Sequence, residues 1–392
     1  MRIALVSDTY SPSVNGVARI TSSLGAELSA NHDVAILAPA AAKVGGGSAP
    51  IEELRLPSFE IPFYRSARAS FGGGVGSQIK DFLMKFEPDV VHLQTHFTLA
   101  ARVLKIAREI GIPVVGTCHS HPEQFALNVP LGSRLLPLLT PIYWRHASSI
   151  LSQAQLVTAP TKATASLLER YGVKTRMQVV PNGVDTDLFS DRPSPLDEQV
   201  RVKYGIPDGP SLLFVGRLDN DKGVTDLLGL IEMLASSRRG QLTVCGGGTQ
   251  ERLVRAAIAE SGMSQRTIMT GVLSPLELSS IYRLSSALVV LNRNEVQPLA
   301  ILEAFACGLP VVCLRNADLA ETVVDGVNGF MRDSLRQVYE AGRRLCCDDS
   351  LRRTVSYHAR ESAESEYSLR AAAQRFLSCY ASVQLHPTEA SM

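Results

Sequence analysis

Short continuous runs of apolar residues recur along this chain of 392 residues, and stretches with helical periodicity separate many of them. Most runs do not alternate with polar positions, which is typical of strands buried on both faces. We expect helices at 97–110 and 224–236, among others. This alternation predicts an α/β protein with parallel, doubly wound sheets. The expected strands are 2–7, 33–37, 89–94, 113–118, 156–159, 178–180, 211–216, 241–245, 266–269, 287–291 and 310–314.

The chain length suits two domains better than one. A polar, proline-containing stretch near 191–195 marks the expected boundary. We therefore expect a first domain at 1–190, a second at 191–365, a helix at 366–385 that packs back on the first domain, and a disordered tail at 386–392. Ligands commonly bind in the cleft between two such domains.

The composition of the chain argues against several classes of function. With 39 basic and 38 acidic residues the net charge is +1, so we expect no nucleic-acid partner. The seven cysteines form no C-x-x-C pair, which favours buried reduced thiols over metal ligands. No apolar run reaches the roughly 18 residues of a membrane span, and the first strand begins without a signal peptide. We expect a cytoplasmic protein that at most sits on the inner face of a membrane.

Two carboxylates eight positions apart, Glu295 and Glu303, carry the strongest chemical signal. Glu295 follows an apolar run that is expected to be a strand. A short helix should start near Pro298 and end at Gly308, which places Glu303 about two turns into it. Parallel sheets bind ligands at the carboxyl ends of their strands, and helix starts attract anions. The segment therefore predicts a ligand site at this edge.

Arg217 and Lys222 lie five positions apart, after one expected strand and before a helix. Arginine supplies a planar fork and lysine a compact charge, and together they suit a phosphate. Taken alone, they are better explained as two solvated cations of a surface turn. Their location on the same expected edge as Glu295 and Glu303 favours the phosphate site.

The first domain offers weaker signals. Gly16 stands at a helix start, where a backbone can approach a ligand closely, although helix starts also tolerate glycine without a ligand. His96, His119 and His121 follow neighbouring expected strands, and three histidines near one edge suggest a site. His92, inside a strand, is expected to be packed in the core. No carboxylate stands at a spacing that would complete a metal site.

In order and spacing, these segments resemble the retaining glycosyltransferases of family 4, which have the two-domain GT-B fold. The resemblance covers about residues 1–380. Within the family, the chain is similar to the branch that glycosylates lipids, such as diacylglycerol glucosyltransferases and phosphatidylinositol mannosyltransferases. The matching segments are Asn15-Gly16-Val17, Val180-Pro181-Asn182-Gly183-Val184-Asp185, Gly216-Arg217-Leu218 with Lys222-Gly223, the two glutamates, and, for the lipid branch, 56–64, 117–123 and Glu295-Val296-Gln297-Pro298.

The resemblance implies a nucleoside diphosphate sugar as donor. Arg217 and Lys222 would bind its diphosphate, and backbone groups at Gly16, Leu299 and Ala300 would complete the phosphate cradle. Negative charge grows on the leaving diphosphate, and fixed cations would stabilise it. The implied mechanism needs no metal ion and no other cofactor, because the two cations replace a divalent ion.

The remaining donor contacts also come from the resemblance. Glu295 would bind hydroxyls of the donor sugar, and Glu303 would bind the ribose. Val272 falls where the family binds the base, and His119 would contact the sugar near the reacting carbon. Two D-x-D triplets, at 185–187 and 219–221, are short enough to arise by chance in polar turns.

The implied reaction is hexose transfer with retention, by front-face attack, to a lipid or glycolipid. Two alternatives stay open: the same donor chemistry on a polysaccharide or small metabolite, and a non-catalytic subunit that binds sugar nucleotides. The segments 59–71 and 135–151 mix large apolar and basic residues. They could contact an anionic bilayer, although core packing with a solvated face explains them equally well.

Overall fold

The computed structural model describes residues 1–13, 15–40, 51–61, 64–70, 72–121, 132–237 and 240–385, with only the backbone of 61, 64–67 and 132–133. The chain divides into two compact units. Unit 1 is Met1–Gly183 together with the chain from Leu369, and unit 2 is Val184–Ser368. The expected tail at 386–392 lies outside the described residues. Within the described part of the chain, no helix has the length and apolar character needed to cross a bilayer.

Unit 1 is built on a seven-stranded sheet in which all the paired strands are parallel. Its order is β3-β2-β1-β6-β7-β8-β9, so the direction of winding reverses between β1 and β6. The strands are β1 Arg2–Val6, β2 Asp33–Pro39, β3 Glu52–Leu56, β6 Val90–Leu93, β7 Val114–Thr117, β8 Leu156–Ala159 and β9 Met177–Val179. A separate antiparallel pair consists of β4 Phe59–Ile61 and β5 Tyr64–Ala69.

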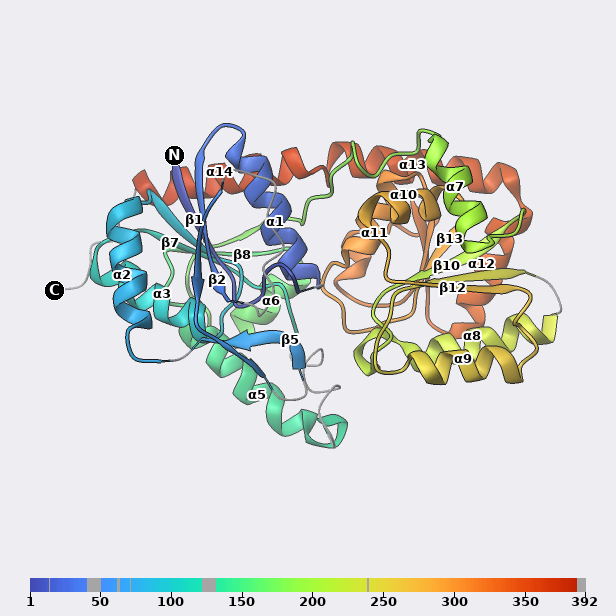
Figure 1. Ribbon diagram of the computed structural model, residues 1–392, viewed down its shortest axis with the longest axis horizontal. Coiled ribbons are helices and arrows are strands. Elements are labelled where there is room, and N and C mark those ends of the chain that lie inside the picture. Colours follow the sequence, from blue (N-terminus) through green and yellow to red (C-terminus); the bar gives the residue numbers. More distant parts are fainter. Residues whose placement is uncertain are drawn as a thin grey trace. The chain divides into compact units, whose positions relative to one another are not determined.

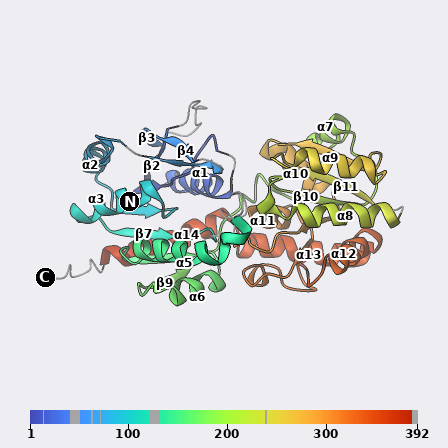
Figure 2. The ribbon, with the colours of Figure 1, turned by 90° about the horizontal axis from the view of Figure 1, so that it is seen from below.

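Helices cover both faces of the sheet of unit 1. On one face α2, α3 and α5 pack over a large apolar core, and on the other α1 and α14 pack over a second core. Figures 1 and 2 show α14, in red, beside α1, in blue, and the two helices are in contact. Unit 1 therefore includes the end of the chain. The helices are α1 Gly16–Ser29, α2 Val75–Phe86, α3 Thr98–Glu109, α5 Gly132–Leu151, α6 Lys162–Arg170 and α14 Leu369–Leu385.

Unit 2 has a six-stranded parallel sheet of order β12-β11-β10-β13-β14-β15. This order is that of a dinucleotide-binding fold, and it reverses between β10 and β13. Helices α7, α10, α11 and α13 cover one face, and α8, α9 and α12 cover the other. The strands are β10 Ser211–Val215, β11 Gln241–Cys245, β12 Thr267–Gly271, β13 Ala287–Val290, β14 Val311–Leu314 and β15 Gly329–Arg332. The helices are α7 Pro195–Tyr204, α8 Val224–Ser237, α9 Glu251–Glu260, α10 Pro275–Arg283, α11 Leu299–Ala306, α12 Leu335–Cys347 and α13 Asp349–Ser365.

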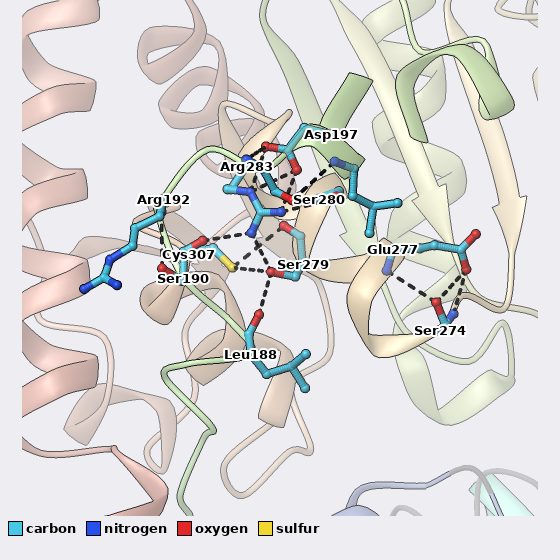
Figure 3. A network of polar contacts seen from close by, with 12 residues as sticks. Leu188, Ser190, Arg192, Asp197, Ser274, Glu277, Ser279, Ser280, Arg283 and Cys307 are labelled. Carbon is cyan, nitrogen blue, oxygen red and sulfur yellow. Dashed lines mark hydrogen bonds and ion pairs between the residues drawn. The ribbon is translucent and has the colours of Figure 1, made fainter. Parts of the chain in front are cut away.

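A polar network shows why unit 2 begins before the proline-containing stretch (Figure 3). Arg283 pairs with Asp197 at 2.5 Å and donates to the backbone oxygen of Ser190 at 3.0 Å. The hydroxyl of Ser279 donates to the backbone oxygen of Leu188 at 3.0 Å. These bonds attach the segment before α7 to α10. Residues 184–190 therefore belong to unit 2, whereas the sequence pattern predicts them in the first domain.

Candidate functional site

The loops after β10 and β13 meet at the carboxyl edge of the sheet of unit 2. Ligands of open α/β sheets bind outside the strand ends where the winding reverses, and this is that point. Gly223 allows the close approach: it has a φ of +73°, and a Cβ there would lie 2.7 Å from the backbone of Leu291. The turn that carries Lys222 can therefore lie directly against the end of β13.

Lys222 and Glu295 form an ion pair across these two loops. The amide of Asn292 donates to the same glutamate oxygen at 3.2 Å, and Asp221 lies 3.7 Å from the lysine ammonium. Burial lowers the pKa of Lys222, but the nearby carboxylates of Glu295 and Asp221 outweigh burial, so the pKa is raised. Lys222 is therefore a charged ammonium at the sheet edge.

Two aspartates orient the guanidinium of Arg217. It contacts Asp219, and its Nη2 donates to Asp221 at 2.9 Å. Asp219 is itself fixed by the backbone amide and the hydroxyl of Thr249, both at 2.8 Å. One of the two D-x-D triplets is thus formed by residues that position an arginine. The sequence pattern did not predict this role, although the two aspartates stand two and four positions after Arg217.

The turn after β11 brackets the Arg217 loop. The amide of Leu218 donates to Gly247 at 2.9 Å, and a Cβ on Gly248 would lie 2.5 Å from the backbone oxygen of Leu218. Val272, after β12, lies 3.7 Å from where a Cβ on Gly247 would stand. Its side chain is 67% exposed, which is unusual for valine and leaves an apolar surface beside this turn.

The helix after Glu295 begins at Leu299, with Pro298 as its N-cap, and no side-chain cap bonds to its first turn in the described structure. The backbone N–H groups of Leu299 and Ala300 thus lie at the positive end of α11. Glu303 is the fifth residue of α11, nearer its start than the two turns expected. It is 1% exposed, and the hydroxyl of Tyr282 donates to it at 2.8 Å.

In unit 1, Gly16 is the first residue of α1. Its neighbour Asn15 caps the helix by accepting from the amide of Ala18 at 2.9 Å, and donates to Thr9 at 2.6 Å. Among the described residues, no atom lies within 4 Å of a Cβ added to Gly16. Packing within the described residues therefore does not explain this glycine.

His119 follows β7 and is bonded to a residue that the sequence analysis missed. Its Nε2 lies 2.8 Å from Oε1 of Gln94, and the amide nitrogen of Gln94 lies 3.0 Å from Nδ1 of His92. Burial lowers the pKa of His119 to about 4. His92 is buried, as expected, but it also supports Gln94. The available signal was the location of Gln94 at the carboxyl end of β6.

The two other histidines, His96 and His121, have different hydrogen-bond partners. His96 is buried, and its Nε2 lies 2.9 Å from the hydroxyl of Tyr143. Burial, followed by the charges of His146 and His119, lowers the pKa of His96 to about 3. His121 lies 3.2 Å from the hydroxyl of Thr164 on α6. The following residues, 122–131, lie outside the described part of the chain.

Two sequence families match the two halves of the chain. Residues 14–188 match the model for Glycosyltransferase Family 4, and residues 197–362 match the model for Glycosyl transferases group 1. These matches account for most of the chain. The protein belongs to the family 4 glycosyltransferases and is an enzyme, which confirms the resemblance found in the sequence.

Individual proteins agree with this assignment. Alpha-monoglucosyldiacylglycerol synthase of Streptococcus pneumoniae is 28% identical over 336 residues, which cover 84% of this chain and 75% of that protein. The D-inositol 3-phosphate glycosyltransferase of Acidothermus cellulolyticus is 30% identical over 258 residues, or 62% of this chain and 56% of that protein. Anabaena HepE, solved in complex with UDP and glucose, superposes with a TM-score of 0.78 at 17% identity, over 97% of this chain and 99% of that chain. The structural likeness confirms the predicted GT-B fold.

Proposed function

We propose that this glycosyltransferase moves a hexose from a nucleoside diphosphate sugar to a lipid or glycolipid, with retention and without a divalent metal ion. One observation carries the proposal: Arg217, Lys222 and Glu295 meet where the winding of the sheet of unit 2 reverses. A diphosphate requires fixed positive charge, and a hexose requires hydrogen-bond acceptors. The loops after β10 and β13 provide both, side by side.

The arrangement suits departure of a diphosphate. Arg217 is oriented in advance by Asp219 and Asp221, and Lys222 is charged, so neither group must reorganise as negative charge develops. The start of α11 adds a positive dipole end. Together these groups would act in place of a divalent cation. When a diphosphate pairs with Lys222, the carboxylate of Glu295 is released to accept from hydroxyls of the hexose.

Retention then requires no covalent enzyme intermediate. The acceptor hydroxyl would attack the face that the diphosphate leaves, and a diphosphate oxygen would take its proton. Glu303 would bind the ribose, because a carboxylate accepts hydrogen bonds from hydroxyl groups, as it does from Tyr282. The exposed side chain of Val272 would pack on the base. The roles expected for Gly16 and His119 stay predictions.

Helix α5 supports a lipid acceptor. Its first turns extend beyond the neighbouring strands of unit 1 (Figure 1), and they expose apolar side chains at helical spacing. Leu138 is 68% exposed and Ile142 65% exposed. A stripe of this kind with basic flanks suits the surface of an anionic bilayer. The stripe is Leu135, Leu138, Leu139 and Ile142, and the exposed flanking residues are Arg134, Arg145 and His146.

The end of α5 has a different role from its start. Trp144 and Ala147 are buried in the core of unit 1, so only the first part of the segment 135–151 is available to a membrane. In the other segment proposed for membrane contact, Phe59 is exposed. Phe63 and Phe71 lie outside the described residues. We therefore place the contact on α5 and propose a cytoplasmic enzyme that binds the inner face of a membrane.

A small-metabolite acceptor is the second candidate, because one relative is named for inositol 3-phosphate and another for a diacylglycerol lipid. The stripe on α5 favours the lipid. A donor screen with chelator separates the two. Purified protein is mixed with UDP-glucose, UDP-galactose, UDP-N-acetylglucosamine, GDP-mannose or ADP-glucose, and either anionic vesicles containing diacylglycerol or inositol phosphate.

Nucleotide release and new glycolipid are both measured. Lipid-dependent release from one donor, lost in Lys222→Ala but kept in Lys203→Ala, supports the proposal. Release that depends on inositol phosphate moves the acceptor to the small metabolite. Nucleotide binding without turnover of any donor would instead indicate a binding subunit, and turnover only after adding Mg²⁺ would remove the metal-independent mechanism.

A further inference from the structure

We infer that Gln94 is a positioning residue that fixes the tautomer of His119, so that His119 presents a hydrogen-bond acceptor, its Nδ1, to the substrate. The inference deepens the proposed function and rests on it for the identity of the substrate, a sugar hydroxyl or an acceptor hydroxyl. The evidence for the tautomer itself is the hydrogen bonding within unit 1.

The contact between the two side chains assigns the proton. Oε1 of Gln94 can only accept, and it lies 2.8 Å from Nε2 of His119, so Nε2 carries the hydrogen. A neutral imidazole with a hydrogen on Nε2 has a lone pair on Nδ1. Burial, which lowers the pKa of His119 to about 4, keeps the ring neutral near pH 7. Within the described residues, Nδ1 of His119 is buried and has no hydrogen-bond partner.

Gln94 lies in a buried network of hydrogen bonds. Gln94 is fully buried, and its amide nitrogen lies against the ring of His92, 3.0 Å from Nδ1 and 3.2 Å from Nε2. His92 is bonded at 2.7 Å to the hydroxyl of Tyr380 on α14, and at 2.7 Å to that of Thr117 on β7. In this network, with groups from β6, β7 and α14, the amide nitrogen of Gln94 lies against His92 and its oxygen lies against His119.

The tautomer decides the direction of the hydrogen bond between His119 and a substrate hydroxyl. With a lone pair on Nδ1 it accepts from a hydroxyl, whereas the other tautomer or the protonated ring would direct an N–H at that hydroxyl. A buried acceptor without a partner has a free-energy cost that a bound hydroxyl removes. Gln94 therefore acts through His119 and need not touch the substrate.

The titratable groups near this pair are His92, His96, Tyr380 and Asp8. His92 on β6 and His96 after it interact electrostatically with His119, and burial lowers the pKa of both to about 3. Tyr380 on α14 is the further titratable group of the network, and burial raises its pKa. The carboxylate of Asp8, at the end of neighbouring β1, accepts from Thr95 at 2.6 Å and from the amide of Leu99 at 2.7 Å.

Replacing the amide by a carboxylate gives a test with a distinctive signature. In Gln94→Glu, an anion against the Nε2–H favours the protonated imidazole and raises the pKa of His119 toward neutrality. We expect kcat/KM to fall about tenfold for each pH unit below that new pKa and to recover above it. Gln94→Leu removes the bond, so we expect a loss of about three- to tenfold that does not recover at high pH.

Gln153→Glu, at an exposed glutamine bonded to Arg108, is the matched control and should keep the wild-type pH profile. Imidazole ¹⁵N shifts of the whole protein, assigned with His119→Asn, report the tautomer without any substrate. Hydrogen on Nε2 in the wild type, together with recovery in Gln94→Glu but not in Gln94→Leu, supports the inference. Hydrogen on Nδ1 of wild-type His119 would overturn it.

An unchanged pH profile in a Gln94→Glu protein whose ¹⁵N shifts show a protonated His119 would also overturn the inference. Failure of the wild type to transfer sugar from any donor would reject the proposed function instead. The nitrogen shifts would then still decide the tautomer, so the two failures are distinguishable.

Discussion

Lys222 and Glu295 pair with each other although 73 positions separate them in the chain. One follows β10 and the other follows β13, and these two strands are neighbours only in the folded sheet. Each is expected to bind a different part of the donor, the lysine its diphosphate and the glutamate its sugar. Their pairing keeps both charges satisfied before a donor arrives.

Removing the ammonium should cost transfer activity. In Lys222→Ala we expect kcat/KM to fall by about 100-fold or more, because one preorganised group that stabilises the leaving charge is lost. Lys203→Ala is the control. Lys203 also forms an ion pair, with Glu277, but it lies on α7 and not in the loops after β10 and β13. Steady-state kinetics with the donor found in the screen measure both. Equal kinetics in the two variants would contradict the role of Lys222.

The buried carboxylate of Glu303, on α11, should strengthen binding of the donor. In Glu303→Gln we expect the KM for the donor to rise about tenfold, because a hydrogen bond from ribose to an ion is replaced by a weaker one. Tyr282→Phe removes a hydrogen bond that the protein itself donates to Glu303, so it should lower stability by about 1 kcal/mol with little change in KM. Titration with nucleoside diphosphate by calorimetry compares them. The opposite ranking would assign Glu303 to the core alone.

The stripe on α5 should govern membrane binding. In Leu138→Glu with Ile142→Glu we expect binding to anionic vesicles to weaken at least about tenfold, since two exposed apolar groups no longer enter the interface. Val202→Glu with Leu276→Glu changes two exposed apolar residues of unit 2 and serves as control. Vesicle sedimentation at low and high salt provides the measurement. Equal wild-type recovery with neutral and anionic vesicles at low salt would argue against the contact.

The network of Figure 3 should stabilise unit 2. In Arg283→Met we expect a loss of roughly 2–3 kcal/mol, because the partly buried carboxylate of Asp197 and several hydrogen bonds lose their donor. Arg255→Met breaks an exposed pair with Glu251 and should cost under about 0.5 kcal/mol. Urea unfolding compares the two variants. Equal losses would mean that the network contributes no more than a surface pair.

Acid should destabilise unit 1 through its buried histidines. Burial, the largest cause for each, lowers the pKa of His92 and His96 to about 3 and that of His119 to about 4. Between the unfolded pKa of about 6.5 and these values, the unfolded chain binds more protons, so stability is lost as pH falls. Each histidine contributes up to about 1.4 kcal/mol per pH unit in that window.

Thermal unfolding between pH 4 and 8 measures this dependence. His96→Gln should make it shallower than the control His358→Gln does, at a partly exposed histidine of α13. Parallel curves for the wild type and His96→Gln would show that His96 titrates normally in the folded protein.

Much of the fold was predictable because buried parallel strands are continuous apolar runs. Eleven expected strands correspond to β1, β2, β6–β9 and β10–β14 within a few residues. The edge strand β3, with the sequence Glu52-Glu53-Leu54-Arg55-Leu56, was missed because its polar residues are tolerated where one side of a strand lacks a partner. Strand β15, which has four residues and lies at an edge of the other sheet, was also missed.

The division between units depended on contacts distant in sequence. The prolines and polar residues near 193 suggest a domain boundary, but Pro195 begins α7 and Ser194 is the N-cap of this helix. Arg283 attaches this segment to α10 from 86 positions away. No local pattern around residue 190 contains that contact.

The sequence by itself determined the alternation of strands and helices, the family, and the residue types that could bind a diphosphate sugar. These features are local, because burial on both faces and the ends of helices leave their pattern in consecutive residues. Only the tertiary structure decided that Asp219 and Asp221 orient Arg217, that Gln94 connects His92 with His119, and that the exposed stripe belongs to the start of α5. Side-chain partners depend on which strand ends become neighbours, and pairing between distant segments sets that.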